Sequence, residues 1–237
     1  MSKALLLAGH GSHLNSRSSE AVRAHARKLA STGVWDEVRV AFWKEEPSLA
    51  RALDGCVAED VTVVPVFMSE GYFTSDVIPT EMDLEGPVTR RRGRTVRCTD
   101  PVGVHPALAD IIVERALEVG TKPVDVVFVL GHGTDRNVDS SNSVHQQIKR
   151  VSTLDRFAEV FAVFTDQEPN IRSVLDLAQG RAATIVPFFV SEGWHVGQVA
   201  AEGAAGIRYT EPAGTHRDLA TVITDLAQEV LSSEKQS

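Results

Sequence analysis

The sequence predicts an α/β fold built from two tandem, doubly wound domains, each with a parallel four-stranded sheet and related to the other by an internal repeat. Two observations lead to this prediction. The chain repeats itself over most of its length, and within each repeat short apolar runs alternate with segments of helical spacing. The 237 residues are enough for two small domains of about 120 residues. We place these domains at residues 1–121 and 122–237.

The repeat is visible without gaps. Gly9-His10-Gly11 returns as Gly131-His132-Gly133, and residues 9–73 share 21 identities in 65 positions with residues 131–195. A match of this length indicates two copies of one structural unit. The later Pro-x-Gly-x-His segments, 101–105 and 212–216, match at a smaller offset. The first repeat therefore carries 11 extra residues between positions 74 and 98.

The elements follow in the same order in both repeats. In the first repeat the apolar runs predict strands at 4–8, 37–43, 61–68 and 95–99, and helices at 18–30, from Glu46-Pro47-Ser48 onward, and at 106–119. In the second repeat the strands fall near 124–130, 158–164, 183–190 and 206–210, and the helices near 139–151, 169–178 and 216–231. Continuous apolar strands that alternate with helices are typical of a parallel sheet covered on both faces.

Polar residues that could bind a ligand or take part in catalysis follow these strands directly. The Gly-His-Gly, Glu-Pro and Ser-Glu-Gly segments come after the first, second and third strands of each repeat. Ligands of open parallel sheets bind beyond the carboxyl ends of the strands. We therefore expect these segments to meet at one edge of each sheet and to form a binding site there.

Composition excludes several classes of protein. The formal net charge of −8 argues against a nucleic-acid or membrane-surface binder. Cys56 and Cys98 form no CxxC pair, which argues against a zinc ribbon or a cluster of iron and sulfur, and fits a reducing compartment. The apolar run at 4–8 is too short for a signal peptide, and no stretch approaches the roughly 18 apolar residues of a membrane helix. We expect a cytoplasmic protein. No Walker loop or GxGxxG motif is present, so we expect no organic cofactor.

Three residues of the second repeat predict a metal site. His132 follows the first strand, Glu168 the second and His195 the third. Two imidazoles and a carboxylate suit a borderline divalent ion such as Co²⁺, Fe²⁺ or Ni²⁺. Each residue alone has a simpler explanation, as a turn histidine or a carboxylate at a helix N-terminus. Their combination at three strand ends favours metal binding, with Glu168, and Glu192 as a second candidate, accepting protons.

The motifs resemble those of a known family. Leu-Leu-Leu-Ala-Gly-His-Gly-Ser at 5–12, Glu-Pro-Ser-Leu at 46–49 and Val-Val-Pro-Val-Phe-Met-Ser-Glu-Gly at 63–71 are similar to the sirohydrochlorin cobaltochelatase and ferrochelatase family, of the CbiX and SirB type. The resemblance covers nearly the whole chain, as in the long, tandem form of the family. It implies insertion of Co²⁺ or Fe²⁺ into sirohydrochlorin or a related tetrapyrrole, in cobalamin or siroheme biosynthesis. His132 and His195 would hold the metal, and Glu168 would assist.

The two repeats depart from this pattern in different places. In the first repeat the Gly-x-His position reads Gly71-Tyr72-Phe73, so the second histidine is missing. In the second repeat the histidine is present, but residues 196–201 replace the acidic-proline element that survives at 76–79. We predict one working site, on the second repeat. His10 and Glu46 would be a degenerate copy.

Sirohydrochlorin carries carboxylates around a flat ring, so we expect its binding site to offer cationic and aromatic side chains. The densest basic run holds Arg90, Arg91, Arg92 and Arg94, inside the segment that lengthens the first repeat. One hypothesis is that these arginines pair with substrate carboxylates; a solvated hairpin tip explains them equally well. Trp194 and Tyr72 are candidates to stack on the macrocycle, or to serve only in packing.

Other functions remain open at this stage. The missing histidine also fits a non-catalytic carrier of a tetrapyrrole or a metal ion. A histidine phosphatase has a histidine after its first strand, but its chemistry usually needs an arginine before that histidine, where Gly9 and Gly131 stand here. A periplasmic-type binding protein also has two lobes, but no export signal is visible. Two fused repeats predict a monomer or a weak homo-oligomer.

Overall fold

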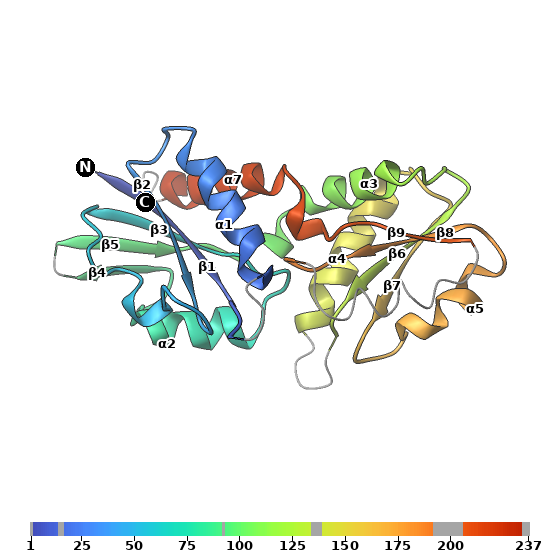
Figure 1. Cartoon of the computed structure of the whole chain (residues 1–237), viewed down its shortest axis with the longest axis horizontal. Coiled ribbons are helices and arrows are strands. Elements are labelled where there is room, and N and C mark those ends of the chain that lie inside the picture. Colours follow the sequence, from blue (N-terminus) through green and yellow to red (C-terminus); the bar gives the residue numbers. More distant parts are fainter. Residues whose placement is uncertain (1, 14–16, 92, 134–138, 192–205, 234–237) are drawn as a thin grey trace. The chain divides into compact units, whose positions relative to one another are not determined.

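The computed structural model describes residues 2–13, 17–91, 93–133, 139–191 and 206–233. The chain forms two compact units (Figure 1). Unit 1 consists of Met1–His105 and Arg217–Ser237, and unit 2 consists of Pro106–His216. Among the described helices, none is both long and apolar enough to cross a membrane.

The sheet of unit 1 has five strands. They are β1 (Lys3–Gly9), β2 (Glu37–Phe42), β3 (Asp60–Pro65), β4 (Val88–Arg91) and β5 (Arg94–Cys98), in the spatial order β2-β1-β3-β5-β4. The four predicted strands are parallel, while β4 pairs antiparallel with β5. The strand β1 is buried from its second residue to its last, as expected for a strand covered on both faces. The extra residues of the first repeat thus add an antiparallel edge hairpin.

The sheet of unit 2 has the four predicted strands. They are β6 (Val126–Gly131), β7 (Glu159–Phe164), β8 (Ala183–Pro187) and β9 (Ile207–Tyr209), in the order β7-β6-β8-β9. All three pairings are parallel. This sheet confirms the doubly wound, four-stranded arrangement that the apolar periodicity predicts.

Helices cover both faces of each sheet, because the central strands β1 and β6 are apolar and buried. In unit 1, α1 (Arg17–Ala30) lies beside α7 (Leu219–Ser233) on one face, and α2 (Ile78–Met82) packs into the core on the other face (Figure 1). In unit 2, α3 (Leu108–Glu118) packs on α4 (Asp139–Thr153) and on β8. The opposite face of this sheet is covered by α5 (Val174–Ala178).

The two compact units are not the two sequence repeats. The boundaries that we drew from the sequence, 1–121 and 122–237, assign α3 to the first repeat and α7 to the second, but α3 packs in unit 2 and α7 in unit 1. In unit 2, Arg115 of α3 donates from Nη2 to Thr215 Oγ1 at 2.8 Å, and His216 Nε2 lies 3.2 Å from Glu114 Oε2. The helix that closes each repeat therefore completes the unit built on the other repeat's strands.

The Glu-Pro segments do not begin long helices. In the first repeat the predicted helix is wrong: only a 3₁₀ turn, η1 (Leu49–Arg51), follows. In the second repeat the turn η4 (Ile171–Ser173) precedes the short α5. The Phe42 N–H donates to Pro47 O at 2.8 Å, and the Phe164 N–H donates to Pro169 O at 2.9 Å. Both loops thus fold back on the end of their strand, a constraint that residue spacing does not reveal.

One further turn was not predicted. The π-helical turn η2 (Phe73–Val77) runs directly into α2 in unit 1. Val77, Ile78 and Met82 of this segment are buried in the core that lies under β1 and β3. The segment is too short for a helical period to be recognised in the sequence.

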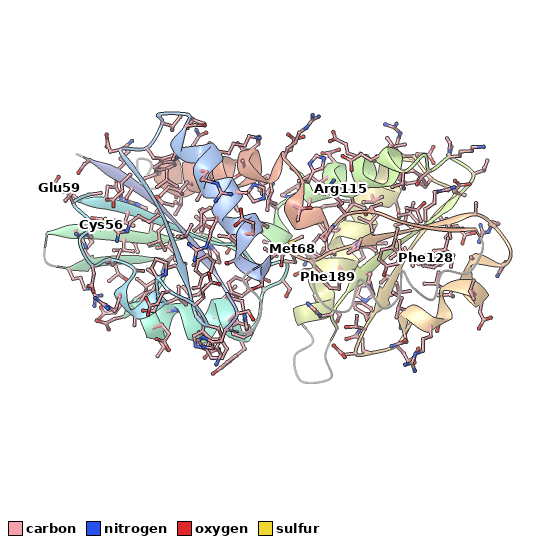
Figure 2. All side chains as sticks on the ribbon, in the orientation of Figure 1. Cys56, Glu59, Met68, Arg115, Phe128 and Phe189 are labelled. Atoms are coloured by element: carbon pink, nitrogen blue, oxygen red, sulfur yellow. The ribbon has the colours of Figure 1, made fainter. Side chains whose placement is uncertain are left out.

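The Gly103 position offers a test of the packing in unit 1. A Cβ atom at Gly103 would lie 2.0 Å from the backbone oxygen of Met68, which is labelled in Figure 2. We expect Gly103→Ala to lower the free energy of unfolding by about 3 kcal/mol, because the backbone must move to admit the methyl group. Urea denaturation measures this loss. The control is Gly33→Ala, where nothing lies within 4 Å of the added Cβ and only the φ of +68° opposes a side chain. Its free energy of unfolding should fall by only about 1 kcal/mol. Equal losses for the two variants would contradict the packing described.

Candidate metal site

The predicted histidine of unit 2 lies directly beside the residues that follow β7. The Asp166 N–H donates to His132 O at 3.0 Å, and the Thr165 N–H donates to Gly131 O at 3.1 Å. Thr165 Oγ1 lies 2.9 Å from both His132 O and Asp166 Oδ2, so that its single proton serves one of them at a time. The β6–β7 ladder thus continues beyond the strands and brings His132 and Asp166 together.

A glycine makes this close approach possible. Gly133 has a φ of +67°, and a Cβ atom there would lie 2.5 Å from Gln167 Cγ. In unit 1, Gly11 has the same φ, and a Cβ atom there would lie 2.8 Å from Glu45 Cβ. A side chain at either position would be strained and would also collide with the neighbouring loop. The Gly-His-Gly motif is therefore required by the contact between two loops in each unit.

The imidazole of His132 packs on an aromatic ring. Its centroid lies 4.3 Å from that of Phe189, with the planes tilted by 32°. Phe189, labelled in Figure 2, is itself buried against the core of unit 2, whereas His132 is exposed. The buried ring fixes the imidazole from one side at the carboxyl edge of the sheet.

The predicted carboxylate, Glu168, has a role in its own loop. Glu168 Oε2 accepts from the Asn170 N–H at 2.8 Å, and Asn170 Nδ2 donates to Thr165 O at 2.9 Å. Both Glu168 and Asp166 are exposed. Asp166 is the carboxylate that sequence reasoning missed. Its signal lay in the strand register: Gly131 is opposite Phe164, so the residues that follow each of them also meet.

The corresponding edge of unit 1 carries different chemistry. The Lys44 N–H donates to His10 O at 2.8 Å, in the same geometry as Asp166 and His132. The position of Asp166 is thus occupied by a lysine. The imidazole of His10 packs edge-on against Trp43 and Phe73, with centroids at 5.4 and 4.8 Å. The Lys44 ammonium repels a metal ion, and the rings of Trp43 and Phe73 offer it no ligand atom. Both features favour the prediction that His10 and Glu46 are a degenerate copy.

Glu46 behaves like its counterpart in the second repeat. Glu46 Oε2 accepts from the Ser48 N–H at 3.0 Å, as Glu168 Oε2 accepts from Asn170. The shared contact shows that both glutamates hold the turn after the Glu-Pro bond. A metal-binding role for Glu168 would therefore use its second carboxylate oxygen.

A second carboxylate of unit 1, Glu45, was also missed by sequence reasoning. Glu45 Oε1 accepts from Ser19 Oγ at 2.8 Å and from Arg23 Nη2 at 2.6 Å. Burial raises the pKa of Glu45, but the hydrogen bonds from Arg23, Ser19 and the Ser12 backbone together lower it below its ordinary value of 4.5. The counterpart in unit 2 is the neutral Gln167. Glu45 thus holds the Gly-His-Gly loop of unit 1 by a charged network.

The described arginines of the basic run, Arg90, Arg91 and Arg94, lie in the β4–β5 hairpin. Because β5 is parallel to β3 and begins at Arg94, the turn of the β4–β5 hairpin lies at the amino edge, opposite to His10. Arg94 Nε donates to Ala58 O at 3.0 Å, and Arg91 pairs with Asp83. This placement favours a structural role for Arg91 and Arg94. Arg90 is part of β4, and Arg92 lies outside the described residues.

Several predicted site residues lie outside the part of the chain that the structure describes. They are Glu192, Trp194 and His195. The two cysteines are both described. Cys56 is buried, and burial raises the pKa of Cys98 to about 12, so Cys98 stays protonated at neutral pH.

The fold is that of a two-repeat α/β protein, and the edge of unit 2 carries the exposed side chains of His132, Asp166 and Glu168. The chain belongs to the CbiX family: the family model matches residues 4–119 and again 126–230. This double match agrees with the internal repeat.

Three known proteins show how close the relationship is. A protein of Halobacterium salinarum named as a probable sirohydrochlorin cobaltochelatase is 39% identical over 214 residues, covering 81% of this chain and 73% of its own length. The structure of a multi-domain protein from Deinococcus radiodurans, described as similar to chelatases, has a TM-score of 0.85 and 32% identity over 96% of this chain. The chain spans only 55% of that longer protein. SirB from Bacillus subtilis, solved with Fe³⁺, has a TM-score of 0.86 over 100% of this chain and 98% of its own, at 18% identity, which shows the shared fold.

The lowered pKa of Glu45 gives a prediction about acid stability. A carboxyl whose pKa is lower in the folded than in the unfolded chain stabilises the fold above the unfolded pKa, and this stabilisation is lost as the pH falls through the folded pKa. We expect native protein to be more stable than Glu45→Gln at pH 7, and the difference to shrink below about pH 4.5. Thermal unfolding of both proteins between pH 3 and 7 measures this. A difference independent of pH would show that Glu45 acts only through neutral contacts.

Proposed function

We propose that this protein is a chelatase that inserts Co²⁺ or Fe²⁺ into sirohydrochlorin or a related tetrapyrrole, in cobalamin or siroheme biosynthesis. The observation that carries the proposal is the edge of unit 2, where the exposed His132 is held by Phe189 and bonded through its backbone to Asp166. Membership of the CbiX family and the name of the Halobacterium relative support the same activity.

The proposed mechanism separates metal binding from proton removal. His132 and His195 bind the ion as neutral imidazoles, which leaves coordination positions open for the ring nitrogens. Asp166 and Glu168 offer carboxylate oxygens that complete the coordination or accept the protons that leave the ring. Asp166 is added to the predicted set because it is the carboxylate nearest in register to His132.

The remaining features of the proposal follow from the sequence. We propose that the protein acts in the cytoplasm, as a monomer or weak homo-oligomer. Its partners are the tetrapyrrole and the metal ion, with Ni²⁺ as a further candidate metal, and it needs no organic cofactor, nucleic acid or membrane. The acidic composition supports the lack of nucleic-acid and membrane partners, and the fusion of two repeats in one chain supports a monomer or weak homo-oligomer.

Metallation can be followed by anaerobic absorbance. Purified protein is mixed with sirohydrochlorin and Co²⁺ or Fe²⁺, and the spectral change of the ring is timed. We expect the native chain to accelerate the change, and His132→Ala or His195→Ala to lower the rate on the order of 100-fold or more, because a ligand is lost. Asp166→Asn should lower the rate while the ring still binds.

Matched variants in unit 1 test the choice of repeat. His10→Ala and Glu46→Gln make the same changes at the equivalent positions, and Co²⁺ titration should give them the native metal affinity. If His10→Ala abolished Co²⁺ binding and His132→Ala did not, the site would belong to unit 1. If the native chain bound the ring and metal without accelerating insertion, the function would be that of a carrier, which the degenerate site of unit 1 also fits.

A further inference from the structure

The carboxyl edge of unit 1 holds a cluster of aromatic rings that the proposed metal chemistry does not use. The cluster consists of Trp43 after β2, Phe67 after β3, and Tyr72 and Phe73 at the start of η2, packed around His10 after β1. Trp43 and Phe73 lie 5.2 Å apart, and Phe67 stacks on Phe73 at 5.6 Å. These residues come from three adjacent strand ends, at the edge where parallel sheets bind ligands.

Part of the cluster faces solvent. Trp43, Phe67 and Phe73 are only half-buried against the core of unit 1, and Tyr72 is 62% exposed. In unit 2 the positions of Trp43 and Tyr72 are occupied by Thr165 and Trp194, and the position of Phe73 by His195. The Trp43 N–H donates to Gly9 O as the Thr165 N–H donates to Gly131 O, so the backbone of this loop does not require an aromatic side chain at Trp43. A ligand with a large flat face would explain the cluster.

A cation accompanies the rings. Lys44 Nζ lies 3.6 Å from the centroid of the Trp43 ring, and no carboxylate of the described residues pairs with this ammonium. The two glutamates that follow Lys44 are engaged elsewhere: Glu45 with Arg23 and Ser19, and Glu46 with the Ser48 N–H. Lys44 can therefore pair with an anionic ligand while its stem stays on the Trp43 face.

We propose that Trp43, Lys44, Tyr72 and Phe73 form a binding site for a flat, conjugated macrocycle that carries carboxylates, the chemical class of the proposed substrate. The aromatic faces contact the ring system, and Lys44 pairs with a peripheral carboxylate. Two of these residues, Lys44 and Phe73, occupy the sequence positions that Asp166 and His195 hold in the second repeat. The inference rests on the proposed function for the identity of the ring, and on the geometry of unit 1 for the site.

The test is a titration of the native chain and its variants with sirohydrochlorin in the absence of metal, followed by absorbance. Trp43→Thr and Lys44→Asp introduce the residues that the second repeat carries at these positions, so the loop backbone is compatible with both. Tyr72→Ala changes an exposed residue and keeps the test valid if Trp43→Thr unfolds the protein. We expect each variant to bind the ring about 3- to 10-fold more weakly and to keep the native Co²⁺ affinity.

Two controls separate the site from general effects. Lys122→Asp makes the same change in net charge at an exposed position just before β6, at the amino edge of the sheet, and should leave ring affinity unchanged. Uroporphyrin carries more carboxylates than coproporphyrin, so Lys44→Asp should weaken its binding more, and salt should reduce this difference. Equal losses for Lys44→Asp and Lys122→Asp would overturn the role of Lys44.

The outcomes distinguish this inference from the proposed function. If the native chain metallates sirohydrochlorin, but Trp43→Thr, Lys44→Asp and Tyr72→Ala all bind the ring with native affinity, the inference is wrong and the chelatase proposal stands. If the native chain binds the ring through these residues but does not accelerate metallation, the inference stands and the chelatase proposal fails. If His132→Ala weakens ring binding without metal and the unit 1 variants do not, the ring site belongs to unit 2, and the inference is again overturned.

Discussion

The close contact between two loops at the carboxyl edge of each sheet is the constraint on which the candidate site depends. The loop after the first strand must pass so near the loop after the second that no Cβ fits at Gly11 or Gly133. The backbone bonds from Lys44 to His10 and from Asp166 to His132 require this approach. The histidine between the two glycines is thereby fixed at the strand end, with its side chain at the edge where ligands bind.

This shared backbone lets the two repeats differ in chemistry without differing in fold. The residues bonded to the histidine loop are Trp43, Lys44 and Glu45 in unit 1 and Thr165, Asp166 and Gln167 in unit 2. One set places aromatic rings against the His10 imidazole and an ammonium on the Trp43 ring, and the other places a carboxylate on the loop whose backbone is bonded to His132. The loss of a metal site that we propose for unit 1 would therefore involve more than one histidine. The described loop after β2 differs from the loop after β7 in charge and polarity, which is why we propose a different ligand surface for unit 1.

The first and third strands of each repeat could be predicted because they are mostly apolar runs, and the fold class followed from the alternation of strands with helices. The site was predicted only in part. His132 stands out between two glycines, but Asp166 becomes visible only through the register of β6 and β7, and Glu168 drew attention because it precedes a proline. Composition alone did not predict the role of the arginines. Their charge suggested an anionic ligand, whereas the β4–β5 hairpin places Arg94 at the amino edge of the sheet, where it donates to a backbone carbonyl.

The exchange of closing helices could not be predicted, because α3 and α7 have equivalent sequences of apolar residues and either could cover either sheet. The structure buries Leu219, Val222 and Ile223 of α7 in unit 1, and Leu108, Ile111 and Ile112 of α3 in unit 2. Each unit thus depends on a helix that the other repeat encodes. A repeat cut out at its sequence boundary would lose the partner for one face of its sheet and would leave its own closing helix with an uncovered apolar face. The two repeats are therefore expected to fold together, because unit 1 needs residues from both ends of the chain and unit 2 needs the helix α3 that the first repeat encodes.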